Sequence, residues 1–142
     1  MKGFIEEFAP EMRGFIRDCR VKVQARLPSA VQLVYDNYNF FVIGFSPTRR
    51  PSDAILSLAA HRRGVNLCVL QRGPDLPDPG RILRGTGKVV RNVALESPED
   101  LDRDDVHALI EASLQFARTS MDHAEGPEVV IQSVSTKQRP RR

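Results

Sequence analysis

Six basic side chains in two loops are the residues of this chain best suited to bind an anion. Guanidinium and ammonium groups hold phosphate or carboxylate through charge-assisted hydrogen bonds, which arginine often makes in pairs. If the flanking strands form an antiparallel meander, loops 46–53 and 72–88 leave the same end of the sheet. The sequence therefore predicts an anion site at that end. Its residues are Arg49, Arg50, Arg72, Arg81, Arg84 and Lys88.

Arg84 and Lys88 are expected to matter most within this set. They flank the turn Gly85-Thr86-Gly87, which fixes their backbone before the next strand begins and whose glycines free backbone N–H groups for an anion. The alternative is that all six are ordinary solvated loop residues, since loops are where charged side chains normally lie.

The segment from Tyr35 to Tyr38 is a second, weaker candidate for a site. The two tyrosines flank Asp36 and Asn37, and these polar groups together could line a pocket. Asx-rich turns also form for backbone reasons alone, so we interpret the segment first as a turn.

Other patterns favour neither catalysis nor a bound metal. The turn at 84–88 precedes a strand, whereas a phosphate loop has a longer glycine spacing and leads into a helix. The three histidines lack metal-ligand spacing, and the acidic run 99–105 coincides with a predicted helix start, where negative charge is stabilising. No nucleophile elbow is present. The sequence predicts a binding module, not an enzyme, with no cofactor.

Two segments have apolar residues at three- and four-residue spacing, which predicts amphipathic helices over 10–27 and 102–122. Pro10 fits the first position of a helix, and Asp102 is expected to cap the second, with Asp105 in its first turn. Both helices have one apolar stripe, so each is expected to pack on the same sheet.

Runs of β-branched and aromatic residues predict the strands of that sheet. They are 31–35 and 40–45, which form a hairpin, then 54–60 and 65–71. The turn at 84–88 is expected to deliver a further core strand with Val89, Val90, Val93, Ala94 and Leu95. The predicted fold class is α+β: a two-layer sandwich, α-β-β-β-β-β-α, with an antiparallel sheet of about five strands and both helices on one face.

The end of the chain is expected to form an extension, 126–142, to the domain of residues 1–125. Val129 to Val134 reads as an edge strand that docks on the domain or on a second copy of the chain, so a homo-oligomer through 129–134 is one expectation. A basic tail follows. It holds Lys137, Arg139, Arg141 and Arg142.

Composition limits the class of protein. The 142 residues have a net charge of +3, but four of the 21 basic residues lie in the tail, which leaves 17 against 18 acidic ones. A nucleic-acid partner is therefore not expected. Cys19 and Cys68 show no zinc or redox spacing, no run has the length of a membrane span, and acidic residues near the start stand where a signal peptide would need an apolar stretch. A cytoplasmic location is expected.

Several motifs together resemble the YdhG-like family, a domain of unknown function numbered 1801. They are Phe4-Ile5-Glu6-Glu7-Phe8 with Pro10, Asp78-Pro79-Gly80, the segment from Leu83 to Arg91, and the Leu101-Asp102 helix start. The resemblance covers about residues 1–124. It implies a frataxin-like α+β fold, and one branch of the family is described as an iron chaperone for iron–sulfur cluster assembly.

The first predicted helix is not the acidic ridge that frataxin-like iron binding uses. Its acidic residues, Glu11 and Asp18, alternate with Arg13, Arg17, Arg20 and Lys22, whereas hard cations need clustered oxygen ligands. The sequence therefore predicts a small cytoplasmic module for an anionic ligand or an acidic protein surface. The alternative is an intracellular iron chaperone.

Overall fold

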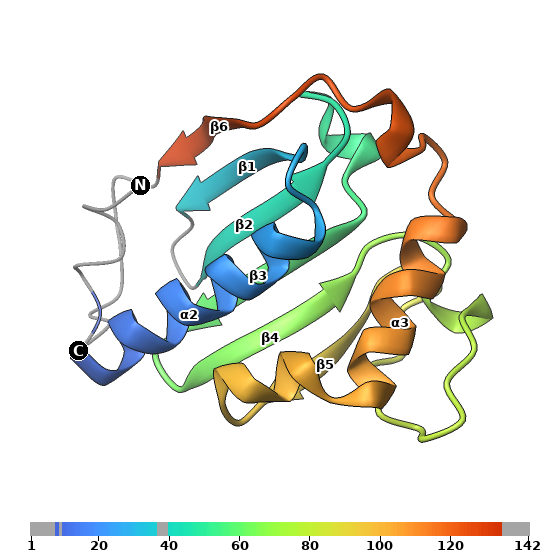
Figure 1. Cartoon of the computed structure of the whole chain (residues 1–142). Helices are drawn as coiled ribbons and strands as arrows, with labels where there is room; N and C mark the ends of the chain where they lie inside the picture. The colour runs from blue at the N-terminus through green and yellow to red at the C-terminus, as the bar shows by residue number, and fades with distance from the viewer. Residues whose placement is uncertain (1–7, 9, 37–39, 135–142) are drawn as a thin grey trace.

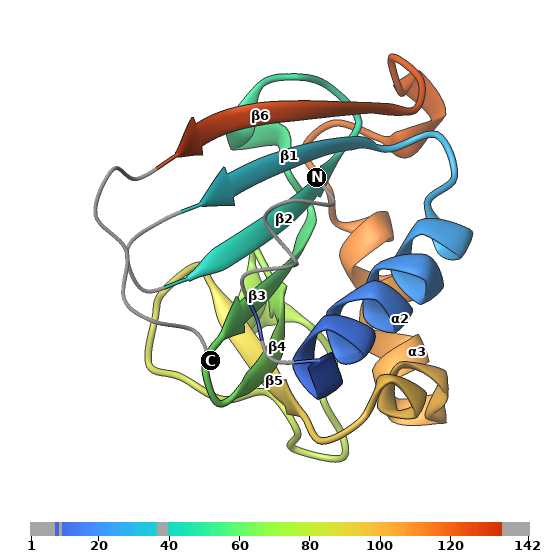
Figure 2. The ribbon, with the colours of Figure 1, turned by 90° about the vertical axis from the view of Figure 1, so that its left-hand side faces the viewer.

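The computed structural model describes residues 8, 10–36 and 40–134. In this part of the chain a six-stranded sheet forms one layer and two α-helices, α2 and α3, form the other. Figure 2 shows both helices on the same face of the sheet, as the sequence predicts. The fold class is α+β.

The first helix, α2, spans Pro10–Arg26, within one residue of its predicted bounds. Pro10 occupies the first position, where a missing N–H costs nothing because no carbonyl precedes it in the helix. Ile16, Cys19 and Val23 are buried, at the three-and-four spacing that places them on one face against the sheet.

The strands occur in the predicted order, with a sixth added. β1 to β5 form an antiparallel meander, whereas β6 pairs with β1 in parallel, so the sheet order is β5-β4-β3-β2-β1-β6. The strands are β1 (Val31–Asp36), β2 (Phe41–Ser46), β3 (Leu56–His61), β4 (Gly64–Val69), β5 (Arg91–Leu95) and β6 (Glu128–Val134).

This arrangement corrects the predicted five-stranded antiparallel sheet. The chain returns from the second helix along the end of the sheet where β1 begins, so the last strand starts beside Val31 and runs in the same direction as β1 (Figure 1). The sheet is therefore mixed. Of the two partners expected for 129–134, the domain and a second copy of the chain, the structure shows the domain, because β6 pairs with β1 at the edge of the sheet.

The strand after the glycine turn begins later than predicted. Val89 and Val90 were expected in the core, but they lie before β5 and are 54% and 44% exposed. The Val89 carbonyl accepts a hydrogen bond from the N–H of Gly73, which holds this residue against the loop after β4. Only Val93 and Leu95 of the run are buried, and the exposed Ala94 between them fits the alternation of a strand with one covered face.

The second helix, α3, is shorter than predicted at both ends and spans Asp104–Gln115. Asp102 ends a short 3₁₀ helix, Pro98–Asp102, and pairs with Lys22 of α2 at 2.6 Å instead of capping α3. At the other end, the N–H of Arg118 donates to the side-chain oxygen of Gln71 over 2.8 Å. Because that N–H is bonded to Gln71, which lies just after β4, the helix does not continue to residue 122.

The core lies between the sheet and the two helices. Val106, Leu109 and Ile110 of α3 are buried in it, as their spacing predicts. None of the helices in the described ranges combines the length and the hydrophobicity that crossing a bilayer requires.

Candidate functional site

Three segments meet at one end of the sheet. The loop from β2 to β3 and the loop from β4 to β5 both start there, as the sequence predicts from the strand directions. The segment 116–125, which follows α3, crosses the same end on its way to β6 (Figure 1). Its Glu125 N–H donates to the Pro47 carbonyl over 2.8 Å, so the segment is fixed to the first loop.

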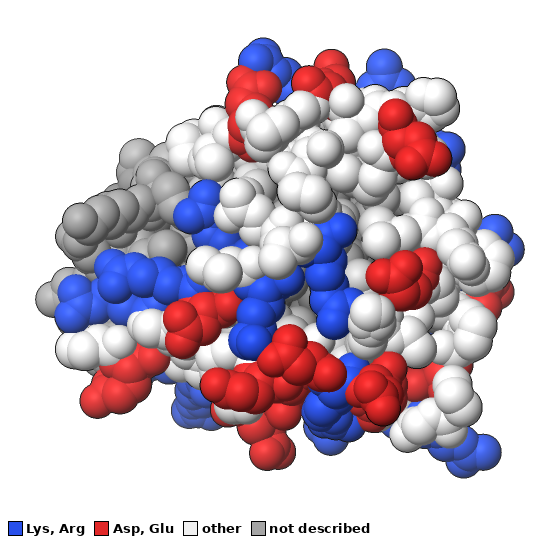
Figure 3. Space-filling model, in the orientation of Figure 1, with Lys and Arg blue, Asp and Glu red and all other residues white. Residues whose placement is uncertain are grey.

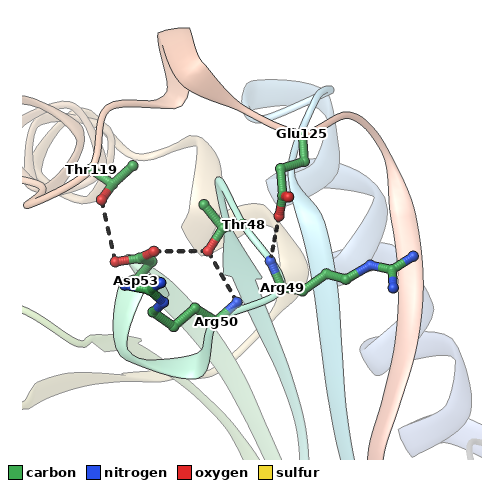
Figure 4. A pocket seen from close by; sticks show the side chains of 6 residues that line it. All are labelled: Thr48, Arg49, Arg50, Asp53, Thr119 and Glu125. Carbon is green, nitrogen blue, oxygen red and sulfur yellow. Dashed lines mark hydrogen bonds between the residues drawn. The ribbon is translucent and has the colours of Figure 1, made fainter.

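A buried carboxylate joins two of these segments. Asp53 ends the 3₁₀ turn Pro51–Asp53 and is only 6% exposed. It accepts hydrogen bonds from the hydroxyls of Thr48, at 2.8 Å, and Thr119, at 3.2 Å (Figure 4). With their neighbours Ser52 and Arg118, these residues separate two hollows.

The first of these, the Thr48 hollow, has a volume of about 470 Å³. It is lined by Thr48, Arg49, Arg50, Asp53, Thr119 and Glu125 (Figure 4). Two backbone N–H groups are bonded within it: that of Arg49 to Glu125 at 2.8 Å and that of Arg50 to Thr48 at 3.0 Å. The Arg49 guanidinium pairs with Glu128 of β6. The lining thus contains two carboxylates and two arginines, one of which is already paired.

The second, the Phe116 hollow, has a volume of about 500 Å³ and a different charge balance. Three cationic side chains and one carboxylate line it, together with apolar surface. The lining residues are Ser52, Leu70, Gln71, Arg72, Asp75, Lys88, Val89, Phe116 and Arg118. Among the described residues, the side chains of Lys88 and Arg118 have no hydrogen-bond or ion-pair partner. Their charges are therefore available to a ligand.

Arg72 connects the cationic and the apolar parts of this hollow. The central carbon of its guanidinium lies 4.9 Å from the ring centre of Phe116, a cation–π contact. Its ion pair with Asp75 is long, 3.5 Å, and exposed, so it contributes little. Arg72 has a left-handed backbone with φ of 52°, which costs a non-glycine residue about 1–2 kcal/mol. The conformation turns the chain after β4 and directs the side chain over the ring.

The six predicted residues are divided by the structure. Arg49 and Arg50 line the Thr48 hollow, and Arg72 and Lys88 line the Phe116 hollow. Two others line neither. Arg81 follows Gly80, which lies beside Asp105 of α3, and Arg84 forms an isolated bridge with Asn92 of β5. The six residues therefore do not gather around a single hollow. Anion binding stays a prediction.

Among the lining residues of the Phe116 hollow that sequence reasoning missed are its aromatic ring, Phe116, and its third cation, Arg118. Both were assigned to the second helix, because the helical spacing of apolar residues continues through Ala117 and Met121. The bond from Arg118 to Gln71 that ends the helical run joins residues 47 positions apart. No local pattern in the sequence indicates such a contact.

The Tyr35–Tyr38 candidate lies only partly within the described residues. Tyr35 is half-buried, and burial raises the pKa of its hydroxyl. Asp36 is buried at the end of β1. Asn37 and Tyr38 lie outside the described residues, so the polar pocket stays a prediction.

Asp100 and Asp105 of the acidic run 99–105 make local contacts. The Asp100 carboxylate accepts the backbone N–H groups of Glu96 and Ser97 at 2.8 and 3.3 Å, and Asp105 pairs with Arg103 at 2.5 Å. The hydrogen bond from that guanidinium lowers the pKa of the Asp105 carboxyl. In the described part of the chain, no group of three or more His, Cys, Asp and Glu side chains is arranged to hold a metal ion.

Charges of both signs are mixed across the face that carries α2. Figure 3 shows Lys and Arg side by side with Asp and Glu there. In comparisons with known proteins, no family model matches the sequence, and neither a curated protein nor a solved structure matches it.

Proposed function

We propose that this protein is a binding module for a small organic anion, and that the ligand occupies the Phe116 hollow. The observation that carries the proposal is the set of three cations, Arg72, Lys88 and Arg118, beside the exposed ring of Phe116. A ligand that fits both parts has a phosphate or carboxylate next to an apolar, preferably aromatic, group.

Size and shape favour a small molecule over an acidic protein surface. A volume of about 500 Å³ falls within the range of about 300–1,000 Å³ typical of ligand pockets. Phe116 is 38% exposed and Val89 54% exposed, so a bound apolar group would remove both from water. The left-handed backbone of Arg72 adds support, because strained conformations concentrate at functional sites.

The alternative function, a frataxin-like iron chaperone, has the YdhG-like family resemblance as its support. It can be tested separately by calorimetric titration with iron. Micromolar binding that is lost when Glu99, Asp100, Asp102, Asp104 and Asp105 are neutralised would favour iron delivery over anion binding. For either function we propose the cytoplasm as the location, since both cysteines are unpaired thiols.

The experiment compares phenyl phosphate with inorganic phosphate as ligands of the full chain, by calorimetry at low and high salt. We expect phenyl phosphate to bind more tightly, because only its ring reaches Phe116. Lys88→Ala and Arg118→Ala should each weaken its binding at least about tenfold, since a hydrogen bond to a charged group contributes about 1.5–3 kcal/mol. Added salt should weaken binding to the wild type.

Two control variants remove an arginine outside the hollow. Arg84→Ala changes the same loop as Lys88, and Arg62→Ala changes the exposed turn between β3 and β4 at the opposite end of the sheet. Both should bind phenyl phosphate as the wild type does. Equal, weak binding in all five proteins would overturn the proposal. Binding of an acidic protein but of neither phosphate compound would assign the cations to a protein partner.

A further inference from the structure

β6 forms one edge of the sheet and leaves apolar side chains exposed. Within the described residues its only neighbour is β1, and both ribbon views show no other labelled element beyond it (Figures 1 and 2). Val129 and Ile131 are 42% and 45% exposed. The outward N–H and C=O groups of an edge strand can pair with another strand.

The two exposed side chains lie on the face that carries the helices. Val129 is in register with Gln32 of β1, and Ile131 with Val34; residues aligned in neighbouring strands share a face. Val34 is in the core, and Gln32 accepts a hydrogen bond from Arg20 of α2 at 2.8 Å. α2 therefore covers β1 on this face but leaves β6 half open.

The regular part of this edge, 129–131, lacks the charges and proline that keep edge strands from pairing. Lysine, proline and inward-pointing charges usually protect such strands, but residues 129–134 contain no charged residue and no proline. Glu128, at the start of β6, is paired with Arg49. The opposite edge of the sheet is different. There Arg84, in the loop that precedes β5, forms a bridge with Asn92 of that strand.

We propose that β6 is a self-association surface and that its partner is the β6 strand of a second copy of this chain. In a two-fold antiparallel pairing centred on Val130, each Val129 faces Ile131 of the other copy, so the exposed apolar side chains cover each other. A two-fold interface uses the same patch twice, and this strand is complementary to itself. An acidic or basic peptide would find no opposite charge along 129–134.

The centre of the pairing follows from the regular part of the strand. β6 has a register shift against β1 after Ile131, where Gln132 has no aligned residue. Such a bulge bends a strand and interrupts its ladder. The regular segment is therefore 128–131, and a centre at Val130 keeps the two Val129–Ile131 pairs inside it.

The test measures the mass of the full chain by sedimentation over a range of concentrations. The wild type should change from one to two chains as concentration rises, and Ile131→Lys should shift that midpoint at least tenfold upward or abolish it. Val21→Lys is the matched control, since Val21 is apolar and 64% exposed on α2. It should associate as the wild type does.

A cysteine at the centre of the pairing tests its register and does not depend on the stability of the lysine variant. Directly opposite antiparallel residues have Cα atoms about 4.5–5.5 Å apart, within the range of a disulfide. Val130→Cys should therefore form a covalent dimer under mild oxidation, whereas the wild type, with Cys19 and Cys68 only, should not. A wild type of single mass at every concentration, or a Val130→Cys protein that stays uncross-linked, would overturn the proposal.

Discussion

Gly73 and Val89 are in direct backbone contact, although 15 residues separate them. The Gly73 N–H donates a hydrogen bond to the Val89 carbonyl over 2.7 Å. A Cβ atom at position 73 would lie 2.8 Å from that oxygen and 2.7 Å from Cγ of Arg91. Only glycine allows this approach, which holds Lys88 and Val89 at the Phe116 hollow.

Gly73→Ala is therefore expected to destabilise the protein and to disturb the hollow. Forcing an extra carbon into this contact should cost about 1–3 kcal/mol of the free energy of unfolding, measured by urea titration. Binding of phenyl phosphate should weaken as well, because Lys88 must move. Gly14→Ala is the control: nothing lies within 4 Å of the added carbon in α2, so it should stabilise by about 0.5–1 kcal/mol. Equal stability of the two variants would contradict this account.

Asp53→Ala is expected to weaken the contact between the two segments that separate the hollows. The substitution leaves the hydroxyls of Thr48 and Thr119 without their charged acceptor. The loss should be about 1.5–3 kcal/mol of the free energy of unfolding. Ser52→Ala, next to it but exposed, should stay within about 0.5 kcal/mol of the wild type. If urea titrations gave the same free energy of unfolding for both variants, the Asp53 carboxylate would not stabilise the contact between the segments.

Most of the fold could be predicted from local patterns. The helix over 10–27, the β1–β2 hairpin and the meander follow from spacing, β-branched runs and turn residues close in sequence. Strand direction then placed two loops at one end of the sheet. The parallel pairing of β6 could not be predicted in this way, because it depends on the path of the chain after α3.

The candidate site was only partly predictable for the same reason. Charge and loop position identified Arg72 and Lys88, but they also selected Arg81 and Arg84, which the structure places outside both hollows. Phe116 and Arg118 enter the Phe116 hollow because a long-range bond to Gln71 keeps this segment from continuing α3. The apolar run that begins with Val89 and Val90 similarly predicted burial, whereas the Gly73 contact holds Val89 outside the strand.

Truncation after Gly126 is expected to lower the melting temperature. It removes β6 and exposes the edge of β1, where Val31 and Leu33 have no exposed surface in the complete sheet. Each fully buried apolar side chain contributes about 1.5–3 kcal/mol. The matched control is truncation after Val134, which removes only residues 135–142 and keeps β6. An identical melting temperature for the two truncated chains would show that β6 contributes nothing to stability.

Alkaline pH should destabilise the protein through Cys19. Burial in α2, followed by the nearby Asp18 carboxylate, raises the pKa of the Cys19 thiol to about 12. The folded chain therefore keeps a neutral thiol, whereas the unfolded chain ionises near pH ~8.5. Because the folded pKa is the higher one, this stabilisation is complete below about pH 8.5 and is lost as the pH rises toward 12.

Comparison with Cys19→Ala isolates the effect of this thiol. Above pH ~8.5 the free energy of unfolding of the wild type should fall more steeply than that of the variant, by about 1.4 kcal/mol per pH unit. The slope is the informative quantity, because the lost packing of Cys19→Ala lowers its stability equally at every pH. Lys22 and Tyr35 are present in both proteins, so their contributions cancel. Urea titrations at three values between pH 7 and 10.5 measure the two slopes, and parallel curves would show that the Cys19 thiol has the same pKa in both states.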